Sequence, residues 1–440
     1  MGAETGRRQA PSLSISLLNS SSASLTILPV TTRFHLQNSH SRLSCTCCIY
    51  ILYIRSGLRL QPSLNPMEEA TICTIWNAVG MSLDQRFAII RSIGLESTDE
   101  DDIRRLLGKK VAPVCYVWCD PSPSVHIAQG IMMVINVRKM VKAGCRVKIL
   151  IADWFARMQH KFDGDLAKIR TFGLYMIEIW KAVGLDLNGV EFIWLSDEIN
   201  SHSAEYWALV MDIFRNNTLR KITRCCEIVD PFMLNRNIND SFDPKNVTAS
   251  TLFTPCVHCA AILLQKADIW LLSMDHEEDL HDKLIRQYCK GMKHERPIIL
   301  SHNKLPNLIE HPELAKNGDP SWAIFIEDRE VYLSYKLSRA FCPAKVAEGN
   351  PCLEYIKYIV FPWFGYFEVL RKEENGGSRT FQNMEELIID YESGALGAGE
   401  VKLALAEALT KILKPIHDHF ANNCEAQNLE DEALSSIPRY

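Results

Sequence analysis

The sequence lacks an apolar run long enough to cross a lipid bilayer, and it lacks a strong excess of charge of either sign. The apolar stretch from Cys45 to Ile54 is followed at once by Arg55 and is roughly half as long as a membrane-spanning helix. The 48 Lys and Arg residues face 53 Asp and Glu residues, for a net charge of −5, which excludes a chain that coats nucleic acid through charge alone. A hydrophobic fraction of 47% over 440 residues suffices for two or three globular domains.

The sequence also lacks the cysteine framework of a small secreted domain. Its 15 cysteines are scattered through apolar segments, which is typical of a reducing compartment. Cys256-Val-His-Cys259 has the spacing of two zinc ligands, but structural zinc usually needs a second pair, and only Cys225-Cys226 is available. The histidines of His276-Glu-Glu-Asp-Leu-His281 are five residues apart, so they lie on different faces of a helix and exclude a metalloprotease motif. We therefore predict no metal site.

Residues 1–66 contain no lysine and one acidic residue, Glu4, but 12 serines and 6 arginines. This bias resembles an organelle transit peptide. The alternative is that the leader does not belong to the natural protein, because ordinary globular composition begins at Met67. We expect a cytoplasmic protein without a membrane partner, or an organellar one if the leader is real.

The most informative segment is 111–136, VAPVCYVWCDPSPSVHIAQGIMMVIN. A β-type apolar run enters a Pro/Ser loop, which opens into a helix predicted to begin at His126, with Ser124 as N-cap and Gly144 as the stop. The first N–H groups of a helix have no partner inside the helix and carry a partial positive charge, so they can bind a phosphate. The segment predicts a nucleotide-binding α/β protein, or else a buried helix start with a hydrogen-bonded histidine.

From Ser82 to about Ile228, helical and extended patterns alternate, which predicts an α/β fold with a parallel sheet covered by helices. Beyond Val331 the pattern is helical without alternating strands. Pro415 should kink or end the last long helix early, and the polar, acidic segment 421–440 should be a disordered tail. Strands are expected at 146–151 and 191–195, and helices at 166–183, 204–214, 331–341, 352–360 and 401–420.

Several longer segments resemble one protein family. They are YVWCDPSPSVHIAQG, the block 143–184, Asp319-Pro320, and Phe341-Cys-Pro with Glu348-Gly-Asn-Pro-Cys-Leu-Glu-Tyr-Ile356. From about Ser82 to Phe420 the chain is similar to tyrosyl-tRNA synthetases of the eukaryotic cytosolic type, particularly those of plants. The resemblance implies a Rossmann-like class I catalytic domain at 67–330 and a helical, anticodon-binding-type domain at 331–420. It also implies tyrosine, ATP with Mg²⁺ and tRNA-Tyr as ligands, and a homodimer.

The resemblance also implies roles for residues near the nucleotide. His126-Ile-Ala-Gln129 occupies the family's His-x-Gly-His position, with His126 and Gln129 facing the phosphates, and Asp120 joins this nucleotide-binding set. Asp275 would hold a ribose, and Lys316 would counter the pyrophosphate. Such positioning suits adenylation, in which the substrate carboxylate attacks the α-phosphate without a protein nucleophile.

The tyrosine site departs from the family pattern. Tyr116 falls where the family hydrogen-bonds the substrate phenol, but Ala261 replaces the carboxylate that binds it. Thr254 and His258 replace the tyrosine and glutamine near the substrate amino group. Preference for tyrosine over phenylalanine should weaken, since rejection of a substrate without the hydroxyl depends on buried polar groups, an effect for which this family is itself the worked example.

Further departures concentrate where ligands would bind. Trp118 and Pro123 stand where the family has small, flexible residues near ATP. Glu277 and Glu278 replace cations, and the segment 396–402 lacks the histidine that packs on an anticodon base. A basic cluster could instead bind tRNA phosphates, although such clusters are usually solvated faces. Its members are Arg215, Arg220, Lys221 and Arg224.

Two hypotheses follow from these observations. The first is a tyrosine-tRNA ligase with impaired activity, which the family resemblance favours. The second is a catalytically silent paralogue that folds and dimerises, and that binds tRNA or pairs with an active homologue, which the altered site residues favour.

Overall fold

The computed structural model describes residues 80–96, 100–186, 189–226, 248–272, 278–292, 295–309, 322–371 and 377–435, all within one compact unit, Cys73–Tyr440. The leader 1–66, most of the polar segment 235–250, Asp275 and Lys316 lie outside the described residues, as does the side chain of Arg224. No described helix is long and apolar enough to cross a membrane.

A six-stranded sheet forms the centre of the α/β part, with one antiparallel edge strand and five parallel strands. The parallel part starts at β2 (Val114–Cys119), adds two strands on one side of it, and then returns to add β5 (Ile269–Leu272) on its other side, so the winding reverses between β2 and β5. In sheets of this type, ligands bind at the carboxyl ends of the strands beside the reversal. The strands in spatial order are β1 (Gly94–Glu96), β6 (Ile298–His302), β5 (Ile269–Leu272), β2 (Val114–Cys119), β3 (Arg146–Ile151) and β4 (Val190–Trp194).

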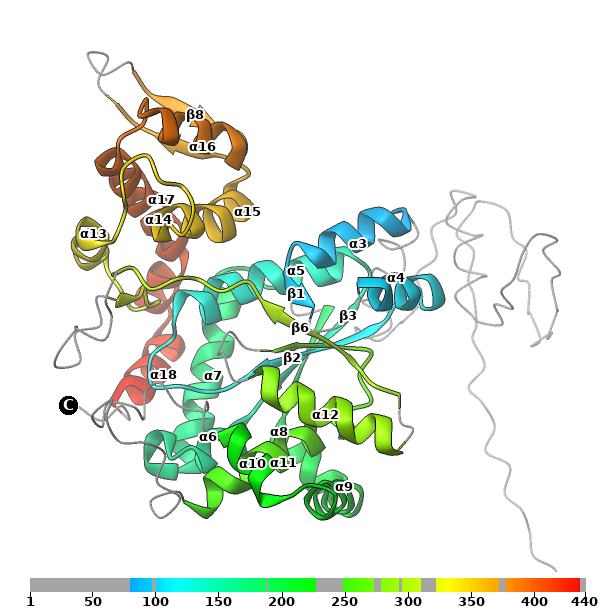
Figure 1. Ribbon diagram of the computed structural model, residues 1–440. Coiled ribbons are helices and arrows are strands. Elements are labelled where there is room, and N and C mark those ends of the chain that lie inside the picture. The colour runs from blue at the N-terminus through cyan, green and yellow to red at the C-terminus, as the bar shows by residue number, and fades with distance from the viewer. Residues whose placement is uncertain are drawn as a thin grey trace, which may run out of the picture. The chain divides into compact units, whose positions relative to one another are not determined.

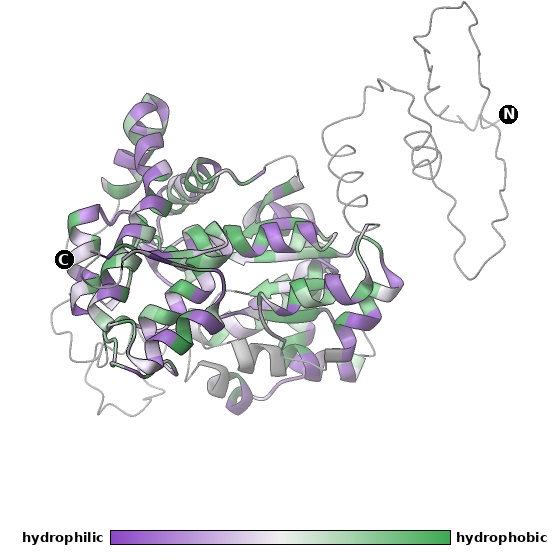
Figure 2. Ribbon diagram, turned by 90° about the horizontal axis from the view of Figure 1, so that it is seen from above, coloured by the Kyte–Doolittle hydropathy of each residue, from purple (hydrophilic) through white to green (hydrophobic). Residues whose placement is uncertain are grey.

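Helices cover both faces of the sheet, as the alternating pattern predicted (Figure 1). Because side chains alternate along a strand, Cys115 and Val117 pack on one face with α5 (Met133–Lys142) and α7 (Leu166–Ala182). Tyr116 and Trp118 pack on the other face. That face is covered by α6 (Asp153–Met158), α9 (Ser203–Arg215), α11 (Ala249–Leu264) and α12 (Glu278–Met292). Many helices carry both hydrophobic and hydrophilic residues along their length (Figure 2).

Further helices complete the α/β part. They are α3 (Leu83–Arg91), α4 (Glu100–Lys109), α8 (Leu195–Ser201) and α10 (Leu219–Cys226). The strand and helix bounds predicted between 146 and 215 are confirmed to within one residue.

The C-terminal part is mostly helical but also contains a hairpin that the sequence pattern did not predict. Phe367–Val369 (β7) pairs antiparallel with Arg379–Phe381 (β8), and buried Phe367 and Phe381 face each other in register. Three-residue strands are too short to produce a clear periodic pattern. The helices are α13 (Glu330–Arg339), α14 (Pro351–Tyr355), the π-helical turn η7 (Ile356–Val360), α15 (Phe361–Phe364), α16 (Met384–Ser393), α17 (Ala398–Asn422) and α18 (Cys424–Ser435).

Of the two outcomes expected at Pro415, a kink or an early end of the helix, the early end does not occur, and the expectation of a disordered tail is wrong for Cys424–Ser435. Helix α17 continues past Pro415 to Asn422, because a buried stripe that includes Leu409, Ile412 and Ile416 holds the helix on both sides of the proline. The expected tail is instead helical over Cys424–Ser435. Asn423 caps this helix by accepting the N–H groups of residues 425 and 426, and Ala426 and Ala433 are buried against the rest of the fold.

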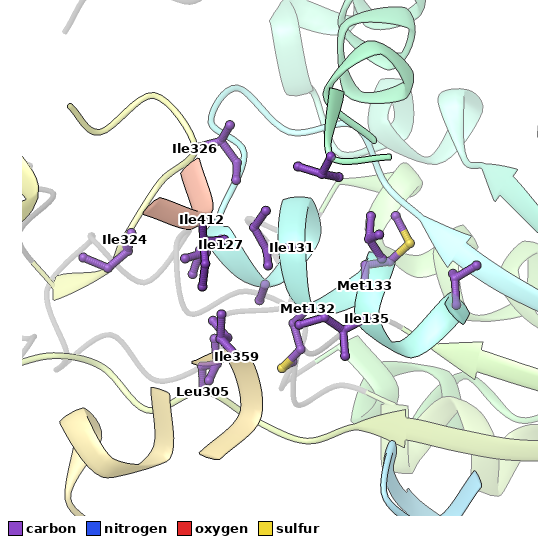
Figure 3. Packing of buried hydrophobic residues seen from close by; sticks show 14 of the residues in the cluster. Ile127, Ile131, Met132, Met133, Ile135, Leu305, Ile324, Ile326, Ile359 and Ile412 are labelled. Atoms are coloured by element: carbon purple, nitrogen blue, oxygen red, sulfur yellow. The ribbon is translucent and has the colours of Figure 1, made fainter. Parts of the chain in front are cut away.

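One hydrophobic core joins the helical part to the sheet. Side chains from the start of the helix after β2, such as Ile127 and Ile131, pack with Ile324, Ile359 and Ile412 (Figure 3). Gly130 permits this close packing, since a Cβ atom there would lie 2.3 Å from Cδ1 of Ile326. The helix that is expected to bind the nucleotide therefore packs against both the sheet and the helical part.

Candidate functional site

The candidate site lies at the carboxyl end of β2, beside the reversal of the sheet. Strand β2 ends at Cys119, the loop 120–127 follows, and a π-helical turn η1 (Ala128–Met132) leads into α5. Gly144, with φ of 87°, follows α5, so the predicted glycine stop is confirmed. The strand, loop and helix predicted from the sequence are thus in place, with the helix starting two residues later than expected.

His126 and Gln129 close the start of this helix. The Nδ1 atom of His126 accepts a hydrogen bond from the N–H of Ala128 at 3.1 Å, and Oε1 of Gln129 accepts one from the N–H of His126 at 3.2 Å. The prediction that Ser124 is the N-cap is wrong, because a β-bridge between His126 and Phe325 draws the following residues into the helix start and leaves Ser124 exposed. His126 and Gln129 are together at the helix start, where they cap backbone N–H groups.

The surroundings of His126 keep its imidazole neutral. The ring stacks on Trp322 at a centroid distance of 6.2 Å and meets Phe325 edge-on at 5.9 Å. Burial, with a smaller contribution from the charge of Lys336, lowers the pKa of His126 to about 4. At neutral pH this histidine therefore offers hydrogen bonds to a ligand but no positive charge.

A variant tests this charge state. In His126→Asn the amide oxygen can still cap the helix, but the titrating group is gone. Below the ordinary histidine pKa of about 6.5, the unfolded wild-type chain binds a proton at residue 126. The folded chain binds this proton only near pH 4, so the free energy of unfolding of the wild type falls as the pH drops. In urea titrations, the free energy of unfolding should fall between pH 7 and pH 5 by about 1–2 kcal/mol less in the variant than in the wild type.

The exposed Ser124 provides the matched control for this experiment. Ser124→Ala should keep the wild-type pH dependence and the wild-type stability, because its side chain has no role at the helix start. An identical pH dependence in His126→Asn and the wild type would contradict the low pKa of His126.

Lys161 brings to this edge a positive charge that the sequence analysis missed. Its Nζ atom lies 2.5 Å from Oδ2 of Asp120 and 2.9 Å from Oγ of Ser122. Lys161 begins the short 3₁₀ turn η2 (Lys161–Gly164) between α6 and α7, where His160 and Phe162 have positive φ angles of 57° and 52°. No motif marks this lysine in the sequence, since only the fold brings residues 41 positions apart together.

The place expected for the substrate tyrosine is packed with aromatic side chains. Trp118 lies 4.9 Å from Phe155, 4.5 Å from His258 and 6.2 Å from Trp270, between ring centroids. Tyr116 packs on Trp270 at 5.0 Å. All five are at most 8% exposed, so indole, phenyl and imidazole rings occupy the space beside Tyr116.

The predicted residues of α11 are at this cluster, but not as a polar lining. The hydroxyl of Thr254 donates to the carbonyl of Ser250, one helical turn earlier, at 2.9 Å. His258 packs against Trp118 and Phe155, and Ala261 is fully buried. Burial, with nearby Glu198 and Glu191, raises the pKa of Tyr116, which remains a neutral phenol.

The basic cluster follows α9 and extends into α10. Arg215 is exposed and pairs with Asp212, at 2.6 Å between Nε and Oδ1. Lys221 donates to Gln287 at 3.2 Å, and Arg220 is exposed. Helices α9, α10 and α11 also carry large exposed apolar side chains, namely Trp207, Met211, Leu219 and Phe253, with exposed fractions of 44 to 67%.

Comparisons with known proteins agree with this geometry. Residues 109–414 match the model of the class I tRNA synthetases (W and Y). Tyrosine-tRNA ligase 1, cytoplasmic, of Arabidopsis thaliana is 49% identical over 348 residues, which are 79% of this chain and 87% of that protein. Tyrosine-tRNA ligase 2, cytoplasmic, of the same plant is 46% identical over 81% of this chain but 46% of its own length.

A solved structure is similar over the same range. Tyrosyl-tRNA synthetase of Leishmania major, in complex with tyrosinol, superposes with a TM-score of 0.70 at 33% identity, over 82% of this chain and 54% of that chain. The chain thus spans most of one of these three relatives and about half the length of the other two.

Proposed function

Because the chain belongs to the class I tRNA synthetases, on their tyrosyl-tRNA synthetase branch, we propose that it is a tyrosine-tRNA ligase whose activation of tyrosine is slow. The reaction would join the tyrosine carboxylate to the α-phosphate of ATP, release pyrophosphate and transfer the tyrosyl group to tRNA-Tyr. The observation that carries this proposal is the helix start of α5 at the reversal between β2 and β5, in a chain 49% identical to a plant tyrosine-tRNA ligase.

The nucleotide would lie along the loop 120–129. Catalysis of adenylation needs positioning and compensation of negative charge rather than a protein nucleophile. Lys161 of η2, which pairs with Asp120, places a positive charge beside this loop, and the side-chain amide of Gln129 lies at the helix start. Lys316 and Asp275 remain predictions for the pyrophosphate and the ribose. Mg²⁺ would accompany ATP and be held mainly by phosphate oxygens and water, since no three His, Cys, Asp or Glu side chains of the described segments form a metal site.

The proposed slowness follows from the aromatic cluster. Tyrosine needs a space beside Tyr116 with a polar group at its phenol end, but Trp118 fills that side and Ala261 offers no acceptor. To bind, the substrate would have to displace an indole that makes three aromatic contacts. This cost reduces the fraction of enzyme that is ready to bind tyrosine.

Pyrophosphate exchange with the purified protein, tyrosine and ATP tests the proposal. Exchange above the tyrosine-free background, but slower than that of the Arabidopsis relative, is the expected result. Complete absence of exchange would favour the second candidate, a silent paralogue, which the packed tyrosine site supports. Binding of tRNA through Arg220 and Lys221, with Arg215 and Arg224, is proposed for either case. The names of the plant relatives support a cytoplasmic location.

We propose a homodimer formed through the apolar surface of α9 to α11, because it exposes Met211 and Leu219 at 62% and 67%. Met211→Lys should convert the dimer into a monomer in size-exclusion chromatography with light scattering, since it would place a charge in the centre of an apolar interface. Ile389→Lys, at a residue 67% exposed on α16, is the matched control and should leave the dimer intact. A dimer that tolerates Met211→Lys would place the interface elsewhere.

A further inference from the structure

Helix α13 buries one face and carries aromatic side chains on the other. Leu333 and Leu337 are buried in the core, and the helix packs against α17 (Figure 1). The opposite face of such a helix is normally polar. Here it carries Val331, Tyr332 and Tyr335, which are 84%, 38% and 47% exposed. Large apolar side chains that gather on one exposed face mark a surface that contacts a partner.

The two tyrosine rings on this face are parallel. Their planes differ by 10° and their centroids lie 6.1 Å apart, since residues three apart are neighbours on a helix surface. The guanidinium of Arg339, one turn further along, lies 5.5 Å from the centroid of Tyr335 and donates to its hydroxyl at 2.7 Å. The Nζ atom of Lys336 lies 4.7 Å from the centroid of Tyr332. These contacts hold both rings in one orientation before a partner binds, which lowers the entropic cost of binding.

Positive charge lies at the C-terminal end of this row of rings. Arg339 is exposed, and Lys402 of α17 donates to the carbonyl of Ser338 at 3.0 Å, so its ammonium lies beside the last turn of α13. The charge of Lys336, in contrast, is buried and paired with Asp328. A guanidinium can bind a phosphate through two parallel N–H groups. Flat rings with cations at one end therefore match a strand of flat bases joined by phosphates.

We propose that Tyr332 and Tyr335 form a stacking surface for unpaired bases of a bound RNA, and that Arg339 and Lys402 hold phosphates of the same strand. The inference rests on the proposed function only for the identity of the RNA, which is tRNA-Tyr there. Every base has a flat face, so stacking tolerates any sequence but requires a base that is not paired. The surface on α13 therefore selects single-stranded nucleotides, whereas the basic cluster at α9 and α10 offers charge alone, which attracts single and double strands.

Fluorescence anisotropy with labelled RNA and the full-length protein tests the stacking surface. The probes are a short single-stranded RNA and the duplex of the same strand with its complement. Replacing Tyr332 and Tyr335 by alanine together should weaken binding of the single strand about tenfold and leave binding of the duplex unchanged. Tyr335→Phe should bind both probes as the wild type does, because a phenyl ring still stacks. Ile389→Ala, at a residue 67% exposed on α16, is the control for loss of an exposed apolar side chain.

Salt titrations with the single strand test the phosphate contact. The logarithm of the affinity falls linearly with the logarithm of the salt concentration, with a slope set by the number of phosphates that the protein neutralises. Arg339→Gln should make this slope shallower by about one phosphate contact. The double alanine variant should keep the wild-type slope, because stacking releases no counterions. A slope unchanged by Arg339→Gln would overturn the assignment of Arg339 to a phosphate.

The outcomes separate this site from the proposed ligase activity. Equal affinity of the wild type and the double alanine variant for the single strand would overturn the stacking surface, and so would a wild type that does not bind the strand. Pyrophosphate exchange needs no RNA, so exchange without tyrosine-dependent RNA binding would refute this site alone. Tyrosine-dependent RNA binding without exchange would keep the site and refute the ligase.

Discussion

Replacing Trp118 by glycine and Ala261 by aspartate together is expected to raise tyrosine-dependent pyrophosphate exchange at least about tenfold, which corresponds to about 1.4 kcal/mol of transition-state stabilisation. The first change removes the indole that packs among Phe155, His258 and Trp270. The second places a carboxylate on the face of α11 that contributes to the same cluster. Together they provide the space and the acceptor that a bound phenol needs.

The two single variants should separate space from selectivity. Trp118→Gly alone should raise exchange with tyrosine and with phenylalanine alike, because it only opens the site. Adding Ala261→Asp should favour tyrosine, since a buried carboxylate without a hydroxyl partner is costly when phenylalanine is bound. The ratio of kcat/KM for the two amino acids measures this step.

The opened variant should also be less stable. Trp118 is 7% exposed, and truncation of a buried tryptophan costs about 3–5 kcal/mol. Phe172→Gly is the matched control: Phe172 is fully buried in the core on the opposite face of the sheet, and this variant should lose similar stability without a gain in exchange. A folded double variant without increased exchange would show that the block lies elsewhere, with the loop around Lys316 the next segment to test.

Lys336→Met is expected to lower the free energy of unfolding by about 3–5 kcal/mol, because it leaves a buried carboxylate without its cation. Lys336 is completely buried, and its Nζ atom lies 2.8 Å from Oδ2 of Asp328 and 2.9 Å from the carbonyl oxygen of Ala323. The same Asp328 oxygen accepts the N–H of Phe325 at 2.9 Å. The pair therefore fixes the segment that forms the β-bridge with His126.

Urea titrations of Lys336→Met and of an exposed pair measure this effect. Lys414→Met breaks the ion pair between Lys414 and Asp418, two side chains that are 68% and 53% exposed. This variant should change the free energy of unfolding by no more than about 1 kcal/mol. A double variant, Lys336→Met with Asp328→Asn, should recover part of the loss, since the unpaired charge is gone. Equal effects of Lys336→Met and Lys414→Met would contradict the buried pair as the element that holds Phe325.

The sequence alone determined most of the α/β framework. The apolar runs at 114–119 and 146–151 became strands, and periodic segments such as 166–182 became helices, because local pattern decides whether a segment can bury one face. Gly144 ends the helix after β2 as predicted. The residue that follows this helix has a positive φ angle, which glycine adopts without steric cost. The tyrosyl-tRNA synthetase resemblance also came from contiguous residues and is confirmed by the comparisons.

Only the tertiary structure decided which side chains meet. The capping of the helix start by His126 depends on the bridge to Phe325, and the Lys161 contact with Asp120 joins two loops. Helix α18 and the passage of α17 through Pro415 depend on packing that outweighs a polar composition and a missing N–H group. Sequence patterns report periods within one segment, whereas these features arise from contacts between segments far apart in the chain. For the same reason the substitutions at 118, 258 and 261 could be noted in the sequence, but the aromatic packing that follows from them required the fold.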